Sequence, residues 1–300
     1  MTNMTLEKRV KIFDTLCERF ECLRPDKLAA AYKIPTVKFK KFQLATMLYL
    51  SRLLHNQIPI LEEGEFFQTF EEQLKSITNI TPNGKILPKS HLTLDFNCWV
   101  RTISDILQDL NIENLLSAIR MPSLRYKAGQ ISENLLQRPY ATEKLHAETW
   151  LGHPKNTICF HAPVIGDLEN NYVEFYSHPS DYEDSWSEPV NDFNKYQEIA
   201  KQFSLLDVKP EAGNLYLFDS TSVHASKRTG PNVGPRISIE IFCLLKETSE
   251  EKKSHQKQFD TFKGDHLVEP KLYFELGKTK LFCLKNTMSG STELRTIVDL

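Results

Sequence analysis

The spacing of apolar residues changes at about residue 120, and this change limits the folds open to the chain more than any other feature. Upstream of it, Leu6, Val10 and Phe13 recur three or four residues apart, which is the stripe of an amphipathic helix. Further helices are predicted over 42–54 and 62–77, and one or two more over 96–119. The first part of the chain, residues 1–120, is therefore predicted to be a helical region.

Downstream of residue 120 the pattern shortens to runs typical of strands, rich in β-branched and aromatic residues and bounded by turn residues. Strands are predicted over 123–126, 156–164, 171–176, 213–218 and 236–245. We expect residues 121–246 to form a β-rich core on which the region 1–120 packs. Residues 247–300 read as a C-terminal extension, with a charged helix-like stretch after Glu247 and a weak strand over 271–275.

Composition excludes several classes of protein. The formal net charge is −2, so the protein as a whole is not attracted electrostatically to nucleic acid or to an anionic membrane. The six cysteines include no CxxC pair, no apolar run is long enough for a membrane span, and the N-terminus lacks a signal-peptide stretch. We therefore expect a cytoplasmic protein whose partner is a small molecule. The sequence gives no oligomeric state.

The motif His146-Ala147-Glu148 is the first candidate for chemistry. In an extended segment, residues two apart point to the same side, so an imidazole and a carboxylate can reach one metal ion. Taken alone the motif is weak, because a surface histidine beside a solvated glutamate has the same pattern.

Two later features fit this motif. His224 follows an apolar strand and a short polar loop, and it can complete a set of two histidines and one carboxylate. Arg236 and Ser238 begin the last strong strand and face the same side of it. An arginine pointing into a β-core needs an anion, and its planar fork matches a carboxylate. Arg228 competes with Arg236 for this role but lies close to the loop after His224.

In this order, and with the run from Pro210 to His224 between them, these motifs resemble the signature of the Fe(II)/2-oxoglutarate-dependent oxygenases. The resemblance covers about residues 121–246 and is strongest to the phytanoyl-CoA-dioxygenase-like branch and to small-molecule oxygenases of bacterial carbohydrate and natural-product pathways. Glu148 stands where Asp is commoner in the family.

The resemblance implies a metal site of His146, Glu148 and His224, with Fe(II), 2-oxoglutarate and O₂ as reactants. It also implies that Arg236 and Ser238 bind the distal carboxylate of 2-oxoglutarate. Further contacts are predicted near these motifs. Asn156 and Thr157 are candidates for the co-substrate, and Arg125, Tyr126 and Trp150 for the substrate. His161 alternates with Phe160 on a strand and can face into the site, but it is expected to be a satisfied residue of the core.

The predicted fold is a double-stranded β-helix, a cupin-like jelly roll, with an N-terminal helical layer, so that the chain is α+β overall. The predicted activity is hydroxylation of an unactivated C–H bond of a small polar metabolite, with release of succinate and CO₂. Two alternatives stay open: a cupin-like metalloenzyme that does not use 2-oxoglutarate, and a non-catalytic jelly-roll binding module.

Overall fold

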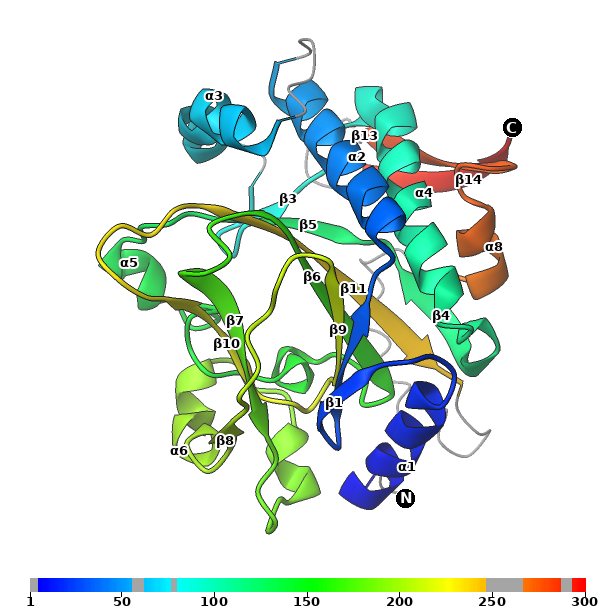
Figure 1. Cartoon of the computed structure of the whole chain (residues 1–300). Helices are drawn as coiled ribbons and strands as arrows, with labels where there is room; N and C mark the ends of the chain where they lie inside the picture. Colours follow the sequence, from blue (N-terminus) through cyan, green and yellow to red (C-terminus); the bar gives the residue numbers. More distant parts are fainter. Residues whose placement is uncertain (1–4, 56–61, 77–79, 247–266, 287–292) are drawn as a thin grey trace.

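Two stacked β-sheets form the centre of the molecule in the computed structural model (Figure 1). The long helices α2 (Thr36–His55) and α4 (Thr93–Asp109) lie on the side of the large sheet, and the short helices α5 (Glu133–Leu136) and α6 (Gln197–Ala200) lie on the side of the small sheet. The structure describes residues 5–55, 62–76, 80–246, 267–286 and 293–300. Further long helices are α1 (Leu6–Cys17) and α3 (Glu63–Ser76). Another short helix is α8 (Pro270–Glu275), and the 3₁₀ turns are η1 (Ser90–Leu92), η2 (Glu113–Leu115), η3 (Glu148–Leu151), η4 (Asp184–Ser187) and η5 (Phe193–Tyr196).

The large sheet runs in the order β1-β2-β9-β6-β11-β4-β12, with β5 also paired to β11 and β3 paired to β5. Its strands are β1 (Leu23–Asp26), β2 (Ala29–Lys33), β3 (Lys85–Ile86), β4 (Leu116–Arg120), β5 (Ser123–Lys127), β6 (Thr157–Gly166), β9 (Asn214–Asp219), β11 (Arg236–Leu245) and β12 (Leu267–Val268). The small sheet has the order β10-β7-β8, from β10 (His224–Arg228), β7 (Asn171–Ser177) and β8 (Ser204–Leu205). A hairpin of β13 (Lys280–Asn286) and β14 (Glu293–Asp299) is separate from both sheets.

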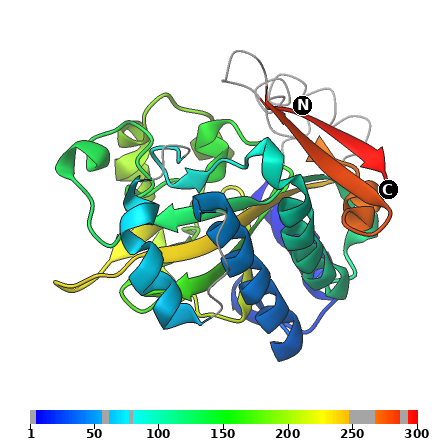
Figure 2. The same cartoon turned by 90° about the horizontal axis from the view of Figure 1, so that it is seen from above.

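Apolar and polar side chains alternate strictly along the first residues of β11, and this alternation shows which face of the large sheet is apolar and which is polar. Ile237, Ile239 and Ile241 belong to the main core with the residues of α2, α3 and α4, the helices that lie along this face in Figure 2. The intervening residues Arg236 and Ser238 point to the opposite side, toward the small sheet. Because side chains alternate along a strand, one strand thus closes the apolar core and lines a polar cavity.

A second, smaller core holds the two sheets together. Val173 and Phe175 from β7 pack against Tyr216 and Phe218 from β9, together with Phe242 from β11. The polar cavity lies between the sheets beside this cluster. Of the described helices, none is long and apolar enough to cross a lipid bilayer.

The structure confirms a helix in each range predicted from periodicity, and it confirms the five predicted strands within a few residues at each end. Two helix ends differ more, because α2 already begins at Thr36 and α4 already ends at Asp109. Two predictions were wrong. Residues 116–119, predicted as the end of a helix, form β4, which pairs with β11 in the large sheet. The segment 271–275, predicted as a weak strand, is helical in α8, where Pro270 occupies the first turn and Tyr273 is buried.

Strands inside the predicted helical region were missed. β2 contains Ala29, Ala30 and Ala31, a run that favours helix, yet it pairs with β9. Ala29 lies opposite Phe218 and Ala31 opposite Tyr216, so small residues fit beside large aromatic ones. The region 1–120 therefore supplies strands to the large sheet as well as its helical layer. The helix-like stretch expected after Glu247 lies outside the described residues.

Packing between α2 and α4 generates a stability prediction. The Trp99 side chain is fully buried on α4, stacks on Tyr49 and donates its indole N–H to Thr46 Oγ1 at 3.1 Å. Trp99→Ala should lower the free energy of unfolding by about 3–5 kcal/mol, because it leaves a large cavity in a packed core. Urea unfolding followed by circular dichroism measures this change.

Leu94→Ala is the matched control on the same helix, because Leu94 is 65% exposed. It should change the free energy of unfolding by less than about 0.5 kcal/mol. Equal losses for the two variants would contradict the packing described for α4.

Candidate metal centre

His146 and Glu148 reach the same point from a short extended segment. Ala147 between them has φ −115° and ψ 151°, and Glu148 begins η3 directly afterwards. This backbone places the two side chains on one side, as the spacing of the motif predicts. Both residues are buried.

His224 comes to this segment from the first position of β10, and the backbone itself joins them. The His146 N–H donates to His224 O at 3.0 Å, and the His224 N–H donates to His146 O at 2.9 Å. The two residues form an isolated antiparallel bridge at the edge of the small sheet. Closely paired positions of this kind bring the side chains together, and the two imidazole rings lie 4.3 Å apart.

The three side chains can hold one metal ion. A ligand atom from each of His146, Glu148 and His224 lies within 4.8 Å of the other two, and His224 Nε2 is 3.3 Å from Glu148 Oε1. Each imidazole has its Nδ1 at a backbone carbonyl, Lys144 O at 2.8 Å for His146 and Ser222 O at 3.2 Å for His224. These contacts favour Nδ1–H tautomers, so Nε2 of both rings offers its lone pair to the centre.

Charge states at this centre suit a cation. Burial, together with the neighbouring His224, lowers the pKa of His146 to about 3. Burial alone would raise the pKa of Glu148, but His153 and His224 outweigh it, and the pKa lies below its usual range. At neutral pH the site therefore presents an uncharged His146 and an ionised Glu148, the forms in which both residues bind metals.

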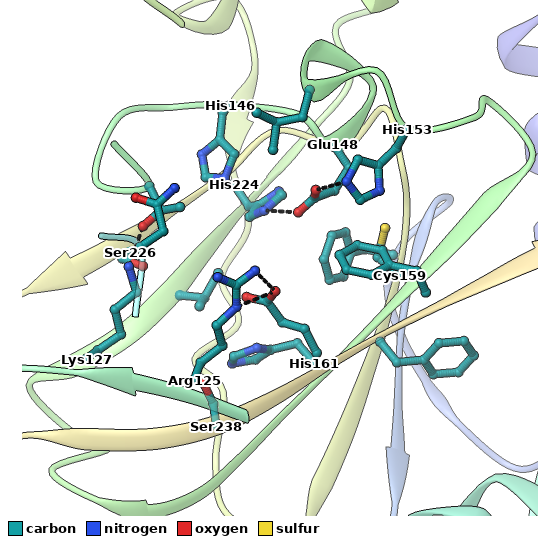
Figure 3. Close-up of a pocket in the computed structure, with 18 of the residues that line it drawn as sticks. Arg125, Lys127, His146, Glu148, His153, Cys159, His161, His224, Ser226 and Ser238 are labelled. Carbon is teal, nitrogen blue, oxygen red and sulfur yellow. Dashed lines mark hydrogen bonds and ion pairs between the residues drawn. The ribbon is translucent and has the colours of Figure 1, made fainter. Parts of the chain in front are cut away.

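The cavity beside this centre is lined by charged and polar groups from four strands of the large sheet. Figure 3 shows His146, Glu148 and His224 converging at one side, with Arg125, His161 and Ser238 across the space from them. The polar side chains of the large sheet that line the cavity are Arg120 on β4, Arg125 and Lys127 on β5, His161 on β6, and Arg236, Ser238 and Glu240 on β11. Register explains the grouping, since Arg236 pairs with Lys127, Ser238 with Arg125 and Glu240 with His161.

Arg236 is the most unusual of these groups. Its residue is 1% exposed, and its Nε and Nη1 have no hydrogen-bond partner among the described residues. Ser238 Oγ and His161 Nε2 are likewise buried and without a partner in the part of the chain described. Burial, with Arg228 nearby, lowers the pKa of Arg236 to about 10, so the guanidinium still carries its charge at neutral pH. A buried cation with open donors indicates a subsite for an anion.

Arg228, the competing arginine, already has partners. Its Nε donates to Ala128 O at 2.8 Å and its Nη1 to Glu143 Oε1 at 3.2 Å. Glu143 also pairs with Lys127 at 3.4 Å, and burial lowers the pKa of that lysine to about 8. Arg228 is absent from the lining of the cavity, so the geometry favours Arg236 as the arginine for a ligand.

Arg125 lies in the cavity wall, as predicted for a substrate contact, but it is not free. Its Nη2 is 2.6 Å and its Nε 2.8 Å from Glu240 Oε2. The pair is partly exposed to the cavity, so a ligand would meet a donor and an acceptor side by side.

Four residues predicted to contact ligands do not line the cavity. Asn156 donates from Nδ2 to Leu245 O at 2.8 Å, and the neighbouring Thr157 is buried at the start of β6. Tyr126 packs in the main core, on the other face of β5. Trp150 donates its indole N–H to Trp186 O at 2.7 Å and packs beside Phe193. Closeness to the motifs in sequence does not bring these side chains into the cavity. Tyr126 and Thr157 lie on strands, Trp150 lies in the turn η3, and Asn156 lies just before β6.

Two further histidines line the cavity. His153 lines the cavity with its Nε2 3.5 Å from Glu148 Oε2. His161 was expected to be a satisfied core residue, but its Nε2 faces the cavity without a partner among the described residues, so that interpretation was wrong. Its position between Phe160 and Ala162, which face the main core, was the signal that could have shown this, because alternation along β6 turns His161 to the other face.

The segment between β7 and β8 forms a wall behind the metal centre. Phe193 is fully buried and stacks on His146, with the ring centroids 4.7 Å apart and the planes 20° apart. Trp150, Ala200 and Phe203 complete this aromatic cluster. His146 is therefore held from one side by its backbone bridge and from another by an aromatic ring.

Comparison with known proteins gives likeness of fold only. The sequence matches no protein-family profile and no curated protein sequence. Similar solved structures include the non-heme α-ketoglutarate-dependent epimerase SnoN from nogalamycin biosynthesis, at a TM-score of 0.42 and 8% identity over 79% of this chain and 83% of that chain. An N-substituted L-amino acid dioxygenase from Burkholderia ambifaria AMMD has a TM-score of 0.37 and 12% identity, covering 80% of this chain and 89% of that chain.

EctD from S. alaskensis, solved with 2-oxoglutarate and 5-hydroxyectoine, has a TM-score of 0.40 and 12% identity over 80% of this chain and 76% of that chain. At these values the likeness carries no weight in assigning residues or activity. The assignments rest on the geometry of the site.

The geometry predicts one divalent metal ion per chain. His146→Ala, Glu148→Ala and His224→Ala should each abolish or nearly abolish binding, because three ligands leave no redundancy. Anaerobic calorimetric titration with Fe(II) measures the stoichiometry and affinity. His91→Ala, at an exposed histidine outside the cavity, is the control and should bind as the wild type does. Stoichiometric metal in the His224→Ala protein would remove His224 from the site.

Proposed function

We propose that this protein is an Fe(II)- and 2-oxoglutarate-dependent oxygenase that hydroxylates an unactivated C–H bond of a small polar metabolite. The observation that carries the proposal is the buried, unpartnered Arg236 in the same cavity as the His146, Glu148 and His224 centre. One end of the cavity offers three metal ligands, and the other end offers a guanidinium with open hydrogen-bond donors. A ligand that chelates a metal at one end and carries a carboxylate at the other can bind to both groups.

The donor set fits iron in this role. Two imidazoles and one carboxylate on one face leave positions for a bidentate co-substrate and O₂, the arrangement of non-heme Fe(II) oxygenases. When bound, Fe(II) would supply the oxidation by O₂ that converts 2-oxoglutarate to succinate and CO₂ and places one oxygen atom on the substrate.

The chain's own residues would bind and orient the reactants. Arg236 and Ser238 would hold the distal carboxylate, with two guanidinium N–H groups and a hydroxyl as donors. His161, next to them and also unpartnered, can donate a further hydrogen bond in one of its neutral tautomers. Burial of these groups excludes water and strengthens each contact to an anion.

Three finer parts of the proposal concern fold, branch and substrate. The two antiparallel sheets, stacked with the cavity between them, support a double-stranded β-helix with residues 121–246 as its catalytic core. The order of motifs in the sequence supports the phytanoyl-CoA-dioxygenase-like branch. The six cysteines, all of them free, support a cytoplasmic location. Arg125 and Glu240 in the cavity wall support a polar substrate, because they offer a donor and an acceptor together.

Two alternatives make different predictions. A cupin-like metalloenzyme without 2-oxoglutarate would bind iron but show no interaction between iron and the 2-oxo acid. A binding module would leave the three ligands without metal. Arg236 and Ser238 argue against the first alternative. Burying a cation whose donors have no hydrogen-bond partner is destabilising unless an anion binds there.

Loss of Arg236 should weaken 2-oxoglutarate far more than iron. Truncating one partner of a desolvated charge-assisted contact costs about 2–5 kcal/mol, which at ~1.4 kcal/mol per factor of ten is roughly a thirtyfold to several-thousandfold rise in apparent Kd. Arg236→Lys should recover only part, because a point charge cannot reproduce the fork. The measurement is the visible charge-transfer band of a 2-oxo acid chelated to Fe(II), titrated anaerobically.

Arg228→Ala is the matched control, because it removes a neighbouring arginine that already has partners. It should leave the affinity for 2-oxoglutarate within a small factor of wild type. If iron-loaded wild type gives no band with 2-oxoglutarate, the proposed function is wrong. If Arg228→Ala loses affinity while Arg236→Ala does not, the activity stands and the assignment of the arginine falls.

A further inference from the structure

A buried ion pair outside the cavity joins α1 to the end of β9. Arg9 Nη1 is 2.9 Å from Asp219 Oδ1 and 3.1 Å from Oδ2, and the two residues are 3% and 4% exposed. We infer that Arg9 and Asp219 are positioning residues, which set the geometry of the metal ligands His224 and Glu148 from outside the site. The inference rests on the metal centre of the proposed function and assigns to it two residues that do not contact the metal.

Asp219 shapes the turn that leads to His224. Its Oδ1 accepts hydrogen bonds from the Thr221 backbone N–H at 2.9 Å and from Thr221 Oγ1 at 2.5 Å, and its backbone carbonyl accepts from the Ser222 N–H at 2.9 Å. Ser222 O is in turn the carbonyl at His224 Nδ1, at 3.2 Å. The carboxylate therefore fixes the turn whose carbonyl selects the tautomer and the orientation of the ligand ring.

The same guanidinium nitrogen also holds the segment that follows Glu148. Arg9 Nη1 donates to Lys155 O at 2.8 Å, and Lys155 lies two residues after His153, whose ring contacts the Glu148 carboxylate. Backbone bonds join the two segments further on, because the Ser220 N–H donates to Thr157 O and the Thr149 N–H to Ser220 O. One atom of α1 thus ties together the two chain segments that carry Glu148 and His224.

The chemistry of the pair favours a geometric role over simple stabilisation. Arg9 Nε and Nη2 are buried and have no partner among the described residues, so the guanidinium is incompletely satisfied. Replacing a buried ion pair with apolar residues often leaves stability unchanged or raises it. An apolar pair cannot provide the hydrogen bonds that Asp219 accepts from the turn and that Arg9 donates to Lys155. Thr221 Oγ1, 2.9 Å from His178 Nε2, extends the same network to the end of β7.

The test compares metal affinity with stability in the full-length protein. The variants are Arg9→Gln, Arg9→Lys, Asp219→Asn and the double variant Arg9→Gln/Asp219→Asn, with Co(II) as an air-stable probe in calorimetric titrations. Titrations are done where circular dichroism shows every variant folded, so that Kd refers to native protein. Arg9→Gln and Asp219→Asn should each raise the Kd for Co(II) about ten- to a hundredfold. The double variant should be no worse than the poorer single one, because both remove the same link.

Arg24→Gln is the matched control. Arg24 pairs with Asp14 of α1 at 3.0 Å, but it is partly exposed and lies away from the metal ligands. The Arg24→Gln protein should therefore bind Co(II) with the Kd of wild type. Arg9→Lys keeps the charge and should restore part of the affinity.

The outcomes separate the inference from the proposed function. If wild type binds Co(II) and folded Arg9→Gln binds it equally well with only a lower melting temperature, the pair is merely structural and the inference is overturned. If wild type itself binds no metal, the metal centre is wrong, and the proposed function falls with it.

Discussion

The candidate site depends on one backbone interaction, the pair of hydrogen bonds between His146 and His224. Without this bridge, two ligands from distant parts of the sequence would have no fixed relation, since each lies at the end of a strand or in a loop. Backbone bonds hold a distance more firmly than long side chains can. The carbonyls at Nδ1 of each ring, the Phe193 ring and the Arg9–Asp219 pair then refine an arrangement that the bridge has already set.

The second organising element is β11, which separates the apolar core from the polar cavity. Its isoleucines face the helical layer and its polar residues face the cavity, so one ten-residue strand meets opposite requirements on its two sides. This division explains how a charged cavity can exist at the centre of the molecule. Packing on the apolar face stabilises the strand that holds Arg236 in place. This packing offsets the unfavourable free energy of burying the guanidinium on the polar face.

Much of this could be predicted from local pattern, and the failures have identifiable causes. The alternation of β11 and the spacing of His146 and Glu148 are local signals, and the structure brings both into the arrangement that they indicated. β2 was missed because its alanines favour a helix in isolation, and only the aromatic residues of β9 opposite them make a strand the better choice. The Arg9–Asp219 pair joins residues 210 positions apart, and no pattern in the sequence marks such a partner. The same limit applies to Asn156 and Thr157, whose partners are set by tertiary packing.

The open donors of Arg236 have a consequence for the abundance of the protein in a cell. A chain that buries a guanidinium whose Nε and Nη1 have no hydrogen-bond partner among the described residues is less stable empty than occupied. Any anion that fills the subsite therefore adds to the stability of the native state. At a ligand concentration of one hundred times Kd this linkage amounts to about 2.7 kcal/mol. The steady-state abundance of the protein would then follow the supply of its small-molecule anion, because degradation acts on the opened chain. A group placed for recognition would in this way also couple protein turnover to metabolite supply.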